Sequence, residues 1–479
     1  MENKPSLKLI DAILIVAGSM IGSGIFIVSA DMSRTVGGTG WMLLLWVLSG
    51  LITVLGALSY GELAGMFPKA GGNYHYLKEA YNPLVGFVYG WTLFLVVQCG
   101  TIAAVAVAFA KFSGVLFAPF SEKNILFSIG SFSFSAAQLI GILLIVFLTW
   151  MNSKGIQYGK WIVRIFSSSK IIALFGIIIL GIFVFGNQEV WLENTKDMWR
   201  SGTIAETADG ISNSPLTTLG LISALGIALV GSLFSSDAWN NVTFISGEIE
   251  NPKKNIPLAL LIGTLSVSVI YFFANIAYLH LLPFYGNPHG ASIFEKGIMF
   301  ADQDRVGVSA AFMIFGGIAS IIMAVLIMVS TFSCNNGIIL SSARLFQAMA
   351  KDGLFFDRMK NNNEAGVPSF ALWVQCIWAS VLCLSGKYGL LLDYIMFPVM
   401  FFYIITIAGI FILRKNKPEL DRPYKVWGYP IIPILYIILA ALFCINLLIN
   451  KPLTTYPGFA IVLLGIPVYY YWQNKQKTV

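Results

Sequence analysis

The sequence has little charge for its length. Over 479 residues, Asp, Glu, Lys and Arg together make up 11%, against roughly 25% in ordinary globular chains. Hydrophobic residues make up 57%. A soluble protein of this size could not cover its surface with so few charges, so most of the chain is expected to face lipid. This composition excludes a cytosolic enzyme, a secreted disulfide-rich domain and a disordered chain.

Cysteines and catalytic motifs are also scarce. The five cysteines lie inside apolar runs, and none has a CxxC partner or a histidine at a metal-ligand spacing. We therefore expect small buried side chains rather than disulfides or metal ligands. The sequence has no Walker loop, no HExxH and no GxSxG with plausible partners, so it predicts no enzyme, no cofactor and no metal. The cysteines are Cys99, Cys334, Cys376, Cys383 and Cys444.

Long hydrophobic runs, by contrast, are plentiful. A bilayer core needs about 20 apolar residues per helix, and the runs predict an all-α, multi-pass membrane protein with twelve spans. The segments near 186–216 and 340–369 are expected to be polar loops with some helix at most. The predicted spans lie near residues 9–28, 41–66, 84–110, 133–151, 161–184, 217–245, 257–282, 307–339, 370–385, 389–413, 431–449 and 457–472.

The basic residues set the predicted orientation. With the N-terminus in the cytoplasm, the cytoplasmic loops carry about twice as many Lys and Arg residues as the outer loops, so both termini are expected to be cytoplasmic. The first apolar run lacks a cleavage pattern and is expected to stay as a membrane helix. The net charge is +7, and the basic residues lie in short loops. This distribution favours contact with anionic lipid over binding of nucleic acid. The short tails favour a bacterial plasma membrane.

Two predicted spans are interrupted at related positions. The first contains Gly18–Phe26 (GSMIGSGIF) and the sixth contains Leu233–Asn240 (LFSSDAWN). Glycine costs about 1 kcal/mol relative to alanine in a helix, and paired breaks in two halves point to a transporter site at the membrane midplane. Five spans separate the breaks, so the second half is expected to insert inverted. We predict one transmembrane domain over 1–479, with repeats at 8–185 and 216–413 and two further helices in 430–473.

The first break offers unpaired backbone groups. The amides of Gly22, Ser23 and Gly24 would lie at the start of a half-helix, where the dipole favours a carboxylate. The carbonyls freed just before them, around Ser19 and Met20, suit an ammonium group. The alternative interpretation is that the glycines only let two helices pack closely.

The second break is predicted to complement the first. The carbonyls from Phe234 to Asp237 suit an amino group, and Ser235 and Ser236 between them are small. Asp237 is a carboxyl near the middle of the membrane, which usually marks a function. Alternatively, its side chain caps the freed amides of its own bend. Phe234 could close over a substrate or could simply pack.

One lysine is predicted to lie inside the membrane. Lys170 is about six residues into the fifth span, so it either extends to the interface or donates to freed carbonyls of the first helix, where a sodium ion could otherwise bind. The third span contains Gln98 and Cys99 but no carboxylate, so it offers no proton carrier. This absence favours exchange over proton coupling.

The motifs resemble those of the amino acid–polyamine–organocation (APC) transporters, and most closely the L-type amino acid transporter branch. The resemblance holds from about residue 8 to 425. It implies a LeuT-like fold with two inverted five-helix repeats and two extra helices. The motifs that carry it are Gly18–Phe26, Gly71–Tyr74, Phe244–Pro257, Asn336–Phe346 and Ala350–Gly353.

The resemblance also implies roles for single residues. The amides of Gly22, Ser23 and Gly24 would hold the substrate carboxylate. The carbonyls of Met20, Phe234 and Asp237 would meet the amino group. Phe234 corresponds to a gating aromatic, and Lys170 corresponds to the lysine that replaces a sodium site in Na⁺-independent members.

Two departures from the L-type pattern matter. Residues 235–238 read Ser-Ser-Asp-Ala where L-type members tend to have a tyrosine and paired glycines, so the side-chain preference stays open. Residues 112–132 contain no cysteine, where the animal light chains bond a heavy-chain glycoprotein. We therefore expect no covalent heavy-chain partner.

Together these patterns predict a Na⁺-independent permease for zwitterionic, neutral amino acids that works by alternating access, as an exchanger. The alternatives are a proton-coupled amino acid or polyamine transporter, and an amino acid sensor that binds without transporting.

Overall fold

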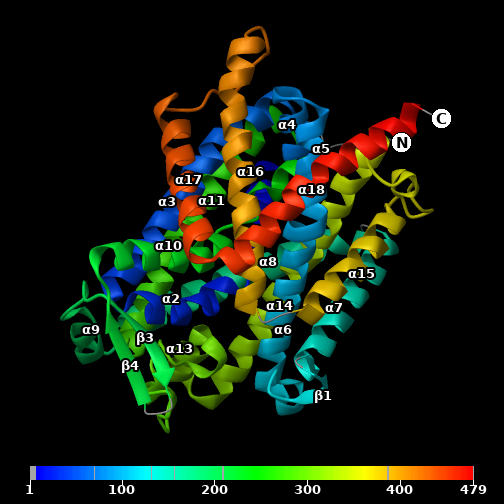
Figure 1. Ribbon diagram of the computed structural model, residues 1–479. Helices are drawn as coiled ribbons and strands as arrows, with labels where there is room; N and C mark the ends of the chain where they lie inside the picture. The colour runs from blue at the N-terminus through cyan, green and yellow to red at the C-terminus, as the bar shows by residue number, and fades with distance from the viewer. Residues whose placement is uncertain are drawn as a thin grey trace.

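The computed structural model describes residues 7–68, 71–130, 132–155, 157–207, 210–385 and 388–477, and these are almost entirely helical (Figure 1). The elements are α1 (Leu9–Met20), η1 (Gly24–Phe26), α2 (Val28–Val36), α3 (Thr39–Met66), α4 (Asn73–Ala80), α5 (Pro83–Thr92), η2 (Leu93–Gln98), α6 (Cys99–Leu116), η3 (Ala118–Phe120), β1 (Ile125–Ile129), β2 (Phe132–Ser135), α7 (Ala136–Ser153), α8 (Gln157–Ile179), η4 (Leu180–Val184), α9 (Gln188–Thr195), β3 (Gly202–Thr207), β4 (Gly210–Pro215), α10 (Thr218–Ser235), η5 (Trp239–Glu248), α11 (Pro252–Leu281), α12 (Ile293–Lys296), η6 (Asp302–Asp304), α13 (Val306–Phe315), α14 (Gly317–Lys351), η7 (Asp357–Lys360), α15 (Ser369–Ser385), α16 (Tyr388–Asn416), α17 (Ile431–Asn450) and α18 (Pro452–Lys477).

Within the described residues, nine helices are long and apolar enough to cross a membrane. A tenth candidate consists of Ser168–Val184 followed by α9, with a bend of 97° between them. The sequence predicted twelve spans. The difference arises because the first span is split into α1 and α2, and because Ser369–Leu384 is shorter than the others. The all-α, multi-pass fold class is confirmed.

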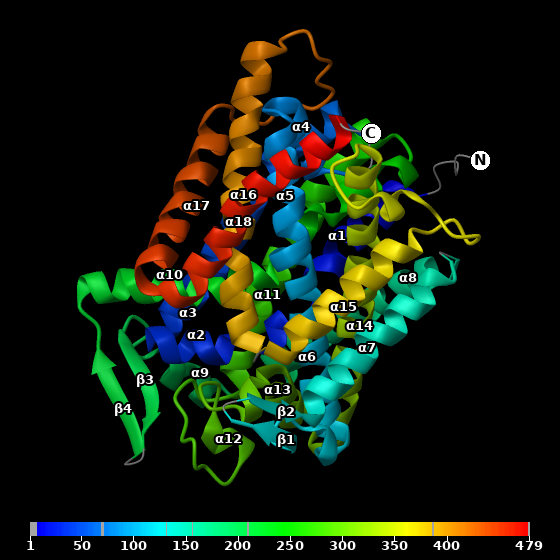
Figure 2. The ribbon, with the colours of Figure 1, turned by 45° about the vertical axis from the view of Figure 1, so that its right-hand side comes forward.

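Two local predictions were wrong. The span predicted over 307–339 is divided at Gly316, whose φ of 72° suits glycine, and α14 continues to Lys351, into the predicted loop. No strand was expected, yet β1 pairs with β2 and β3 with β4 as antiparallel hairpins. β3 and β4 lie in a connection between predicted spans, whereas β2 includes the first residues of the span predicted near 133–151. Figure 2 shows them at one end of the bundle, with α4 and both termini at the other.

The core of the bundle pairs helices from both halves of the chain. α3 packs along α11, α6 packs along α14, and α1 lies against α11 and α8. The five cysteines are buried and free within these apolar contacts, as predicted. This arrangement surrounds the two places where the chain leaves helical conformation.

Both predicted interruptions are present. α1 ends at Met20, and the chain passes through one short turn, η1, before α2 begins at Val28. α10 ends at Ser235, and Ala238 has a left-handed φ of 64° before η5 begins. The Gly-rich step and the Ser-Ser-Asp step therefore each stop a helix inside the apolar bundle.

Candidate binding site at the two interrupted helices

The break after α1 leaves a set of free amide donors. The amide of Ile21 closes α1 on the carbonyl of Ala17 at 2.9 Å, and that of Gly22 bonds Met20 O at 2.8 Å. None of the described residues accepts a hydrogen bond from the amides of Ser23, Gly24 or Ile25. These amides begin a short helical turn, where unpaired donors and the backbone dipole favour an anion.

The carbonyls on the other side of this break are already occupied. Lys170 Nζ donates to Gly18 O at 2.9 Å and to Ile21 O at 3.0 Å. The side chain is buried, with 2% exposed, and does not extend to the interface. The hydroxyl of Ser330 also reaches Ile21 O at 3.2 Å. The ammonium group thus binds freed carbonyls at the unwound end of α1. This is the interpretation in which Lys170 lies where a sodium ion could otherwise bind.

A tyrosine that the sequence did not single out joins the two breaks. The Tyr271 hydroxyl, from α11, lies 2.9 Å from Met20 O and 3.1 Å from Ser235 O. Met20 O also accepts from the amide of Gly22. A substrate ammonium that bound Met20 O, as the resemblance implies, would have to displace one of these donors.

The glycines of the first break differ in their surroundings. A Cβ atom on Gly24 would lie 2.0 Å from Ser235 Oγ and 2.7 Å from Ser235 Cβ. For Gly22 the nearest atom would be Cys334 Sγ at 3.8 Å. Gly24 therefore lets the two interrupted helices touch, while a Cβ atom at Gly22 would make only ordinary van der Waals contacts. Close packing and free amides are thus both present at this break.

Two aromatic rings cover the same region. Ser23 Oγ and the Tyr388 hydroxyl are 3.3 Å apart, so one can donate to the other. The rings of Tyr388 and Phe234 meet edge to face, with centroids 6.1 Å apart. Tyr388 begins α16 and was not predicted, because a tyrosine in an apolar span carries no motif of its own.

A large cavity approaches this aromatic pair from the end that carries the hairpins. It measures about 1000 Å³ and is bordered by α2, α6, α10, α16 and the β1–β2 hairpin. Tyr388 and Ile27 are among its lining residues. The cavity therefore connects the outside of the bundle with the neighbourhood of Ser23. Its charged lining residues are Asp31, Lys111, Glu122, Asp304, Asp393 and Lys451.

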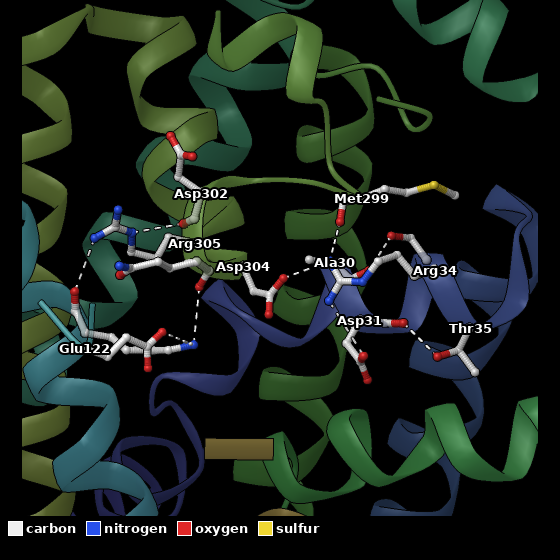
Figure 3. A network of polar contacts seen from close by, with 12 residues as sticks. Ala30, Asp31, Arg34, Thr35, Glu122, Met299, Asp302, Asp304 and Arg305 are labelled. Atoms are coloured by element: carbon white, nitrogen blue, oxygen red, sulfur yellow. Dashed lines mark hydrogen bonds and ion pairs between the residues drawn. The ribbon is translucent and has the colours of Figure 1, made fainter. Parts of the chain in front are cut away.

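Ion pairs tie the rim of this cavity together (Figure 3). Arg34 on α2 donates to Asp304 at 2.8 Å and also to Met299 O. Arg305 Nη1 donates to Lys111 O on α6 at 3.2 Å. Burial lowers the pKa of Arg305, although the nearby carboxylates oppose this shift. The network joins α2 and α6 through the segment before α13.

The Asp237 side chain contacts α16. Its Oδ1 accepts a hydrogen bond of 2.6 Å from the Tyr403 hydroxyl of α16. It lines a second, much smaller cavity of about 30 Å³, next to Gln98 and Asn240. The two interpretations of Asp237 from the sequence did not include this tyrosine, which lies 166 residues away.

A buried carboxylate and its arginine partner connect the helices at the end of the bundle that carries the termini. Glu62, at the end of α3, is fully buried and accepts from Arg414 Nε at 2.9 Å and Nη2 at 2.6 Å. It also accepts from the amide of Val426 at 2.8 Å. Nearby, Lys417 Nζ donates to Glu79 at 2.8 Å, and this hydrogen bond lowers the pKa of Glu79.

A helical membrane bundle in which two broken helices meet, with free amides beside an aromatic residue that lines a large cavity, is typical of a transporter of small solutes. The model of the amino acid permease family matches residues 7–469, so the chain belongs to that family. Its members are transporters rather than enzymes.

Three curated relatives illustrate the similarity. The chain is 29% identical to human "Large neutral amino acids transporter small subunit 2", over 99% of this chain and 82% of that protein. It is 28% identical to mouse "Asc-type amino acid transporter 1", over 99% and 83% of the two chains. It is 30% identical to the "Serine/threonine exchanger SteT" of Bacillus subtilis (strain 168), over 99% and 98%.

Proposed function

We propose that the protein is a Na⁺-independent exchanger of zwitterionic, neutral amino acids. The observation that carries this proposal is that two features occur at the same helix break. The amides of Ser23 and Gly24 are free of hydrogen bonds to the described residues, and the ammonium group of Lys170 bonds carbonyls of the same segment. The names of the relatives add support, because they denote transporters of neutral amino acids and a serine/threonine exchanger.

The site residues keep the roles that the resemblance implies, except Met20, whose carbonyl already accepts from Gly22 and Tyr271. The free amides of Ser23 and Gly24 hold the carboxylate, with the Ser23 hydroxyl assisting, and the Gly22 amide joins them when it leaves Met20 O. The carbonyls of Phe234 and Asp237 take the amino group, and Phe234 closes over the substrate together with Tyr388. The small residues Ser235 and Ser236 flank the amino group, and the carbonyls of Ser19 and Met20 form the remaining wall.

Independence from sodium follows from the position of Lys170. A sodium ion near the unwound end of α1 would need oxygen ligands such as Gly18 O and Ile21 O. Lys170 Nζ already bonds both at 2.9 and 3.0 Å. A fixed ammonium group therefore supplies the positive charge that an ion would otherwise bring.

The membrane setting is also part of the proposal. The distribution of Lys and Arg supports a cytoplasmic position of both termini, with the large cavity facing outward, and the membrane is proposed to be a bacterial plasma membrane. The absence of cysteine from residues 112–132, together with the nearly full-length similarity to SteT, supports a protein that works without a covalent heavy chain.

Counterflow in proteoliposomes tests this function. We expect labelled serine, threonine or leucine to accumulate without Na⁺ only when unlabelled amino acid is present inside. Binding without flux would instead identify a sensor, and uptake that needs a pH gradient but no internal substrate would identify proton coupling.

The Gly22→Val variant separates amino acids from polyamines. A side chain at Gly22 has room in the fold but crowds the free amides, so transport of an amino acid should be lost. A polyamine has no carboxylate, and its transport should persist in this variant.

A further inference from the structure

The Asp237 carboxyl has no Lys, Arg or His among the described residues that line its cavity. It accepts hydrogen bonds from the Tyr403 hydroxyl at 2.6 Å and from the backbone amide of Ala238. The other titratable groups near it are Tyr89 on α5 and Tyr436 on α17, and tyrosines stay protonated near neutral pH. A carboxylate in this position inside a membrane bundle is costly unless it can become neutral.

A series of polar side chains leads from Asp237 toward α4. The Tyr403 ring lies 5.5 Å from the Tyr60 ring of α3, centroid to centroid. The Tyr60 hydroxyl accepts from Asn73 Nδ2 at 2.8 Å. Asn73 is the first residue of α4, the helix that Figure 2 shows at the end with both termini. The series therefore runs from Asp237 toward the end of the bundle that carries α4.

Three buried polar atoms along this series lack a hydrogen bond of acceptable geometry. They are Asn73 Oδ1, the Tyr76 hydroxyl and the Thr406 hydroxyl, and these residues are 0%, 1% and 1% exposed. Buried polar groups are nearly always hydrogen-bonded, and those without a protein partner usually bind ordered water. Water molecules at these atoms would complete a continuous hydrogen-bonded path. The cavity beside Asp237, at about 30 Å³, also has room for water.

We propose that Asp237 is a proton-binding site that exchanges its proton with the cytoplasm along this path. On release, the carboxyl O–H bond breaks and the proton passes to a water molecule and then along the path to the cytoplasm. The resulting carboxylate accepts the Tyr403 hydrogen bond. On uptake the same steps run in reverse, so no other reactant is needed.

Proton binding would act on the interrupted helix. Asp237 lies in the unwound segment between α10 and η5, and its charge strengthens the bond that ties this segment to α16. Neutralising the carboxyl weakens that bond and frees the segment to move. We therefore expect exchange to become faster, by about fivefold, as the pH on the cytoplasmic side falls.

Infrared difference spectra between acid and alkaline pH test proton binding without any transport. The purified wild-type protein should show a protonated-carboxyl C=O band that Asp237→Asn removes and that Tyr403→Phe shifts. Asp421→Asn, which changes an exposed carboxyl with 72% of its side chain accessible, should leave that band in place. A band unchanged in both Asp237→Asn and Tyr403→Phe would overturn the proposal. If Asp237→Asn does not fold, the shift of the C=O band in Tyr403→Phe is sufficient to test the proposal.

A transport measurement tests the consequence and rests on the proposed function. In proteoliposomes, Asp237→Asn should exchange at the fast, acid-side rate at every pH, whereas Asp421→Asn should follow the wild-type profile. A wild-type pH profile retained by Asp237→Asn contradicts the inference. If the wild type shows no exchange at all pH values tested, the proposed function is wrong. The infrared spectra then still test whether Asp237 binds a proton.

Discussion

Gly24 and Ser235 lie in direct contact across the two interrupted helices. A Cβ atom at residue 24 would come within 2.0 Å of Ser235 Oγ, closer than any real contact of this kind. The hydroxyl of Ser235 is held by Gly231 O at 2.7 Å, so it is not free to turn aside. One glycine therefore sets how near the two halves of the site can come.

We predict that Gly24→Ala abolishes exchange and lowers the thermal stability of the purified protein, because the half-helices must separate. Gly22→Ala should keep the wild-type melting temperature and weaken substrate binding only. The double variant Gly24→Ala/Ser235→Gly removes the two closest contacts and leaves only the Cα of residue 235, at 3.1 Å, so it should regain part of the stability. Equal stability of Gly24→Ala and the wild type would contradict the close contact.

Replacing Lys170 with methionine should slow exchange by about tenfold or more. The variant loses two hydrogen bonds from a charged group, each worth roughly 1.5–3 kcal/mol. Gly18 O loses its lysine donor, and among the described residues Ile21 O keeps only the hydrogen bond from Ser330. Initial rates of counterflow measure the effect. Lys196→Met, whose side chain is 76% exposed, is the matched control and should behave like the wild type. Unchanged kinetics in Lys170→Met would mean that the ammonium has no part in the cycle.

Arg414→Met should destabilise the fold much more than Lys253→Met. Arg414 gives the fully buried Glu62 its two shortest contacts to a charged group, and without it Glu62 keeps only Arg422 of the described residues, at 3.6 Å, as a charged partner. Removing one partner of a buried ion pair costs about 3 kcal/mol. Lys253 pairs with Asp421 at the surface, where such a pair is worth about 1 kcal/mol at most. Thermal unfolding in detergent compares the two variants. Similar melting temperatures would show that Glu62 is satisfied without Arg414.

The Glu79–Lys417 pair should make a small, pH-dependent contribution to stability. The hydrogen bond from Lys417 lowers the pKa of Glu79 in the folded protein. The contribution is therefore present above the pKa of the unfolded chain, about 4.3, and is lost as the pH falls through the lower, folded value. The melting temperature of Glu79→Gln should lie below that of the wild type at neutral pH and converge with it in acid. A constant difference at all pH values would contradict this.

Part of the site was predictable because it is local. Glycines at 22 and 24, and the Ser-Ser-Asp step ending at Asp237, weaken a helix wherever they occur in an apolar run, so both breaks could be placed from the sequence. Lys170 could be assigned to a span but not to its partners, because its side chain is long enough to reach either the interface or α1.

The rest depends on distant contacts. Tyr271, Tyr388 and Tyr403 reach the breaks from α11 and α16, and each is an ordinary apolar-span residue until the helices pack. The same holds for the rim of the large cavity, where Arg34 meets a carboxylate 270 residues away. Such contacts follow from the three-dimensional arrangement and leave no periodic or local signal.

The position of Tyr271 has one more consequence. Its hydroxyl carries a single hydrogen but faces two acceptors, Met20 O and Ser235 O, which therefore compete for it. When one half-helix moves away, the Tyr271 hydroxyl can donate fully to the carbonyl of the other. Moving the two half-helices away from Tyr271 one after the other therefore costs less free energy than moving both at once. A shared hydrogen thus favours a stepwise opening of the two halves over a simultaneous one.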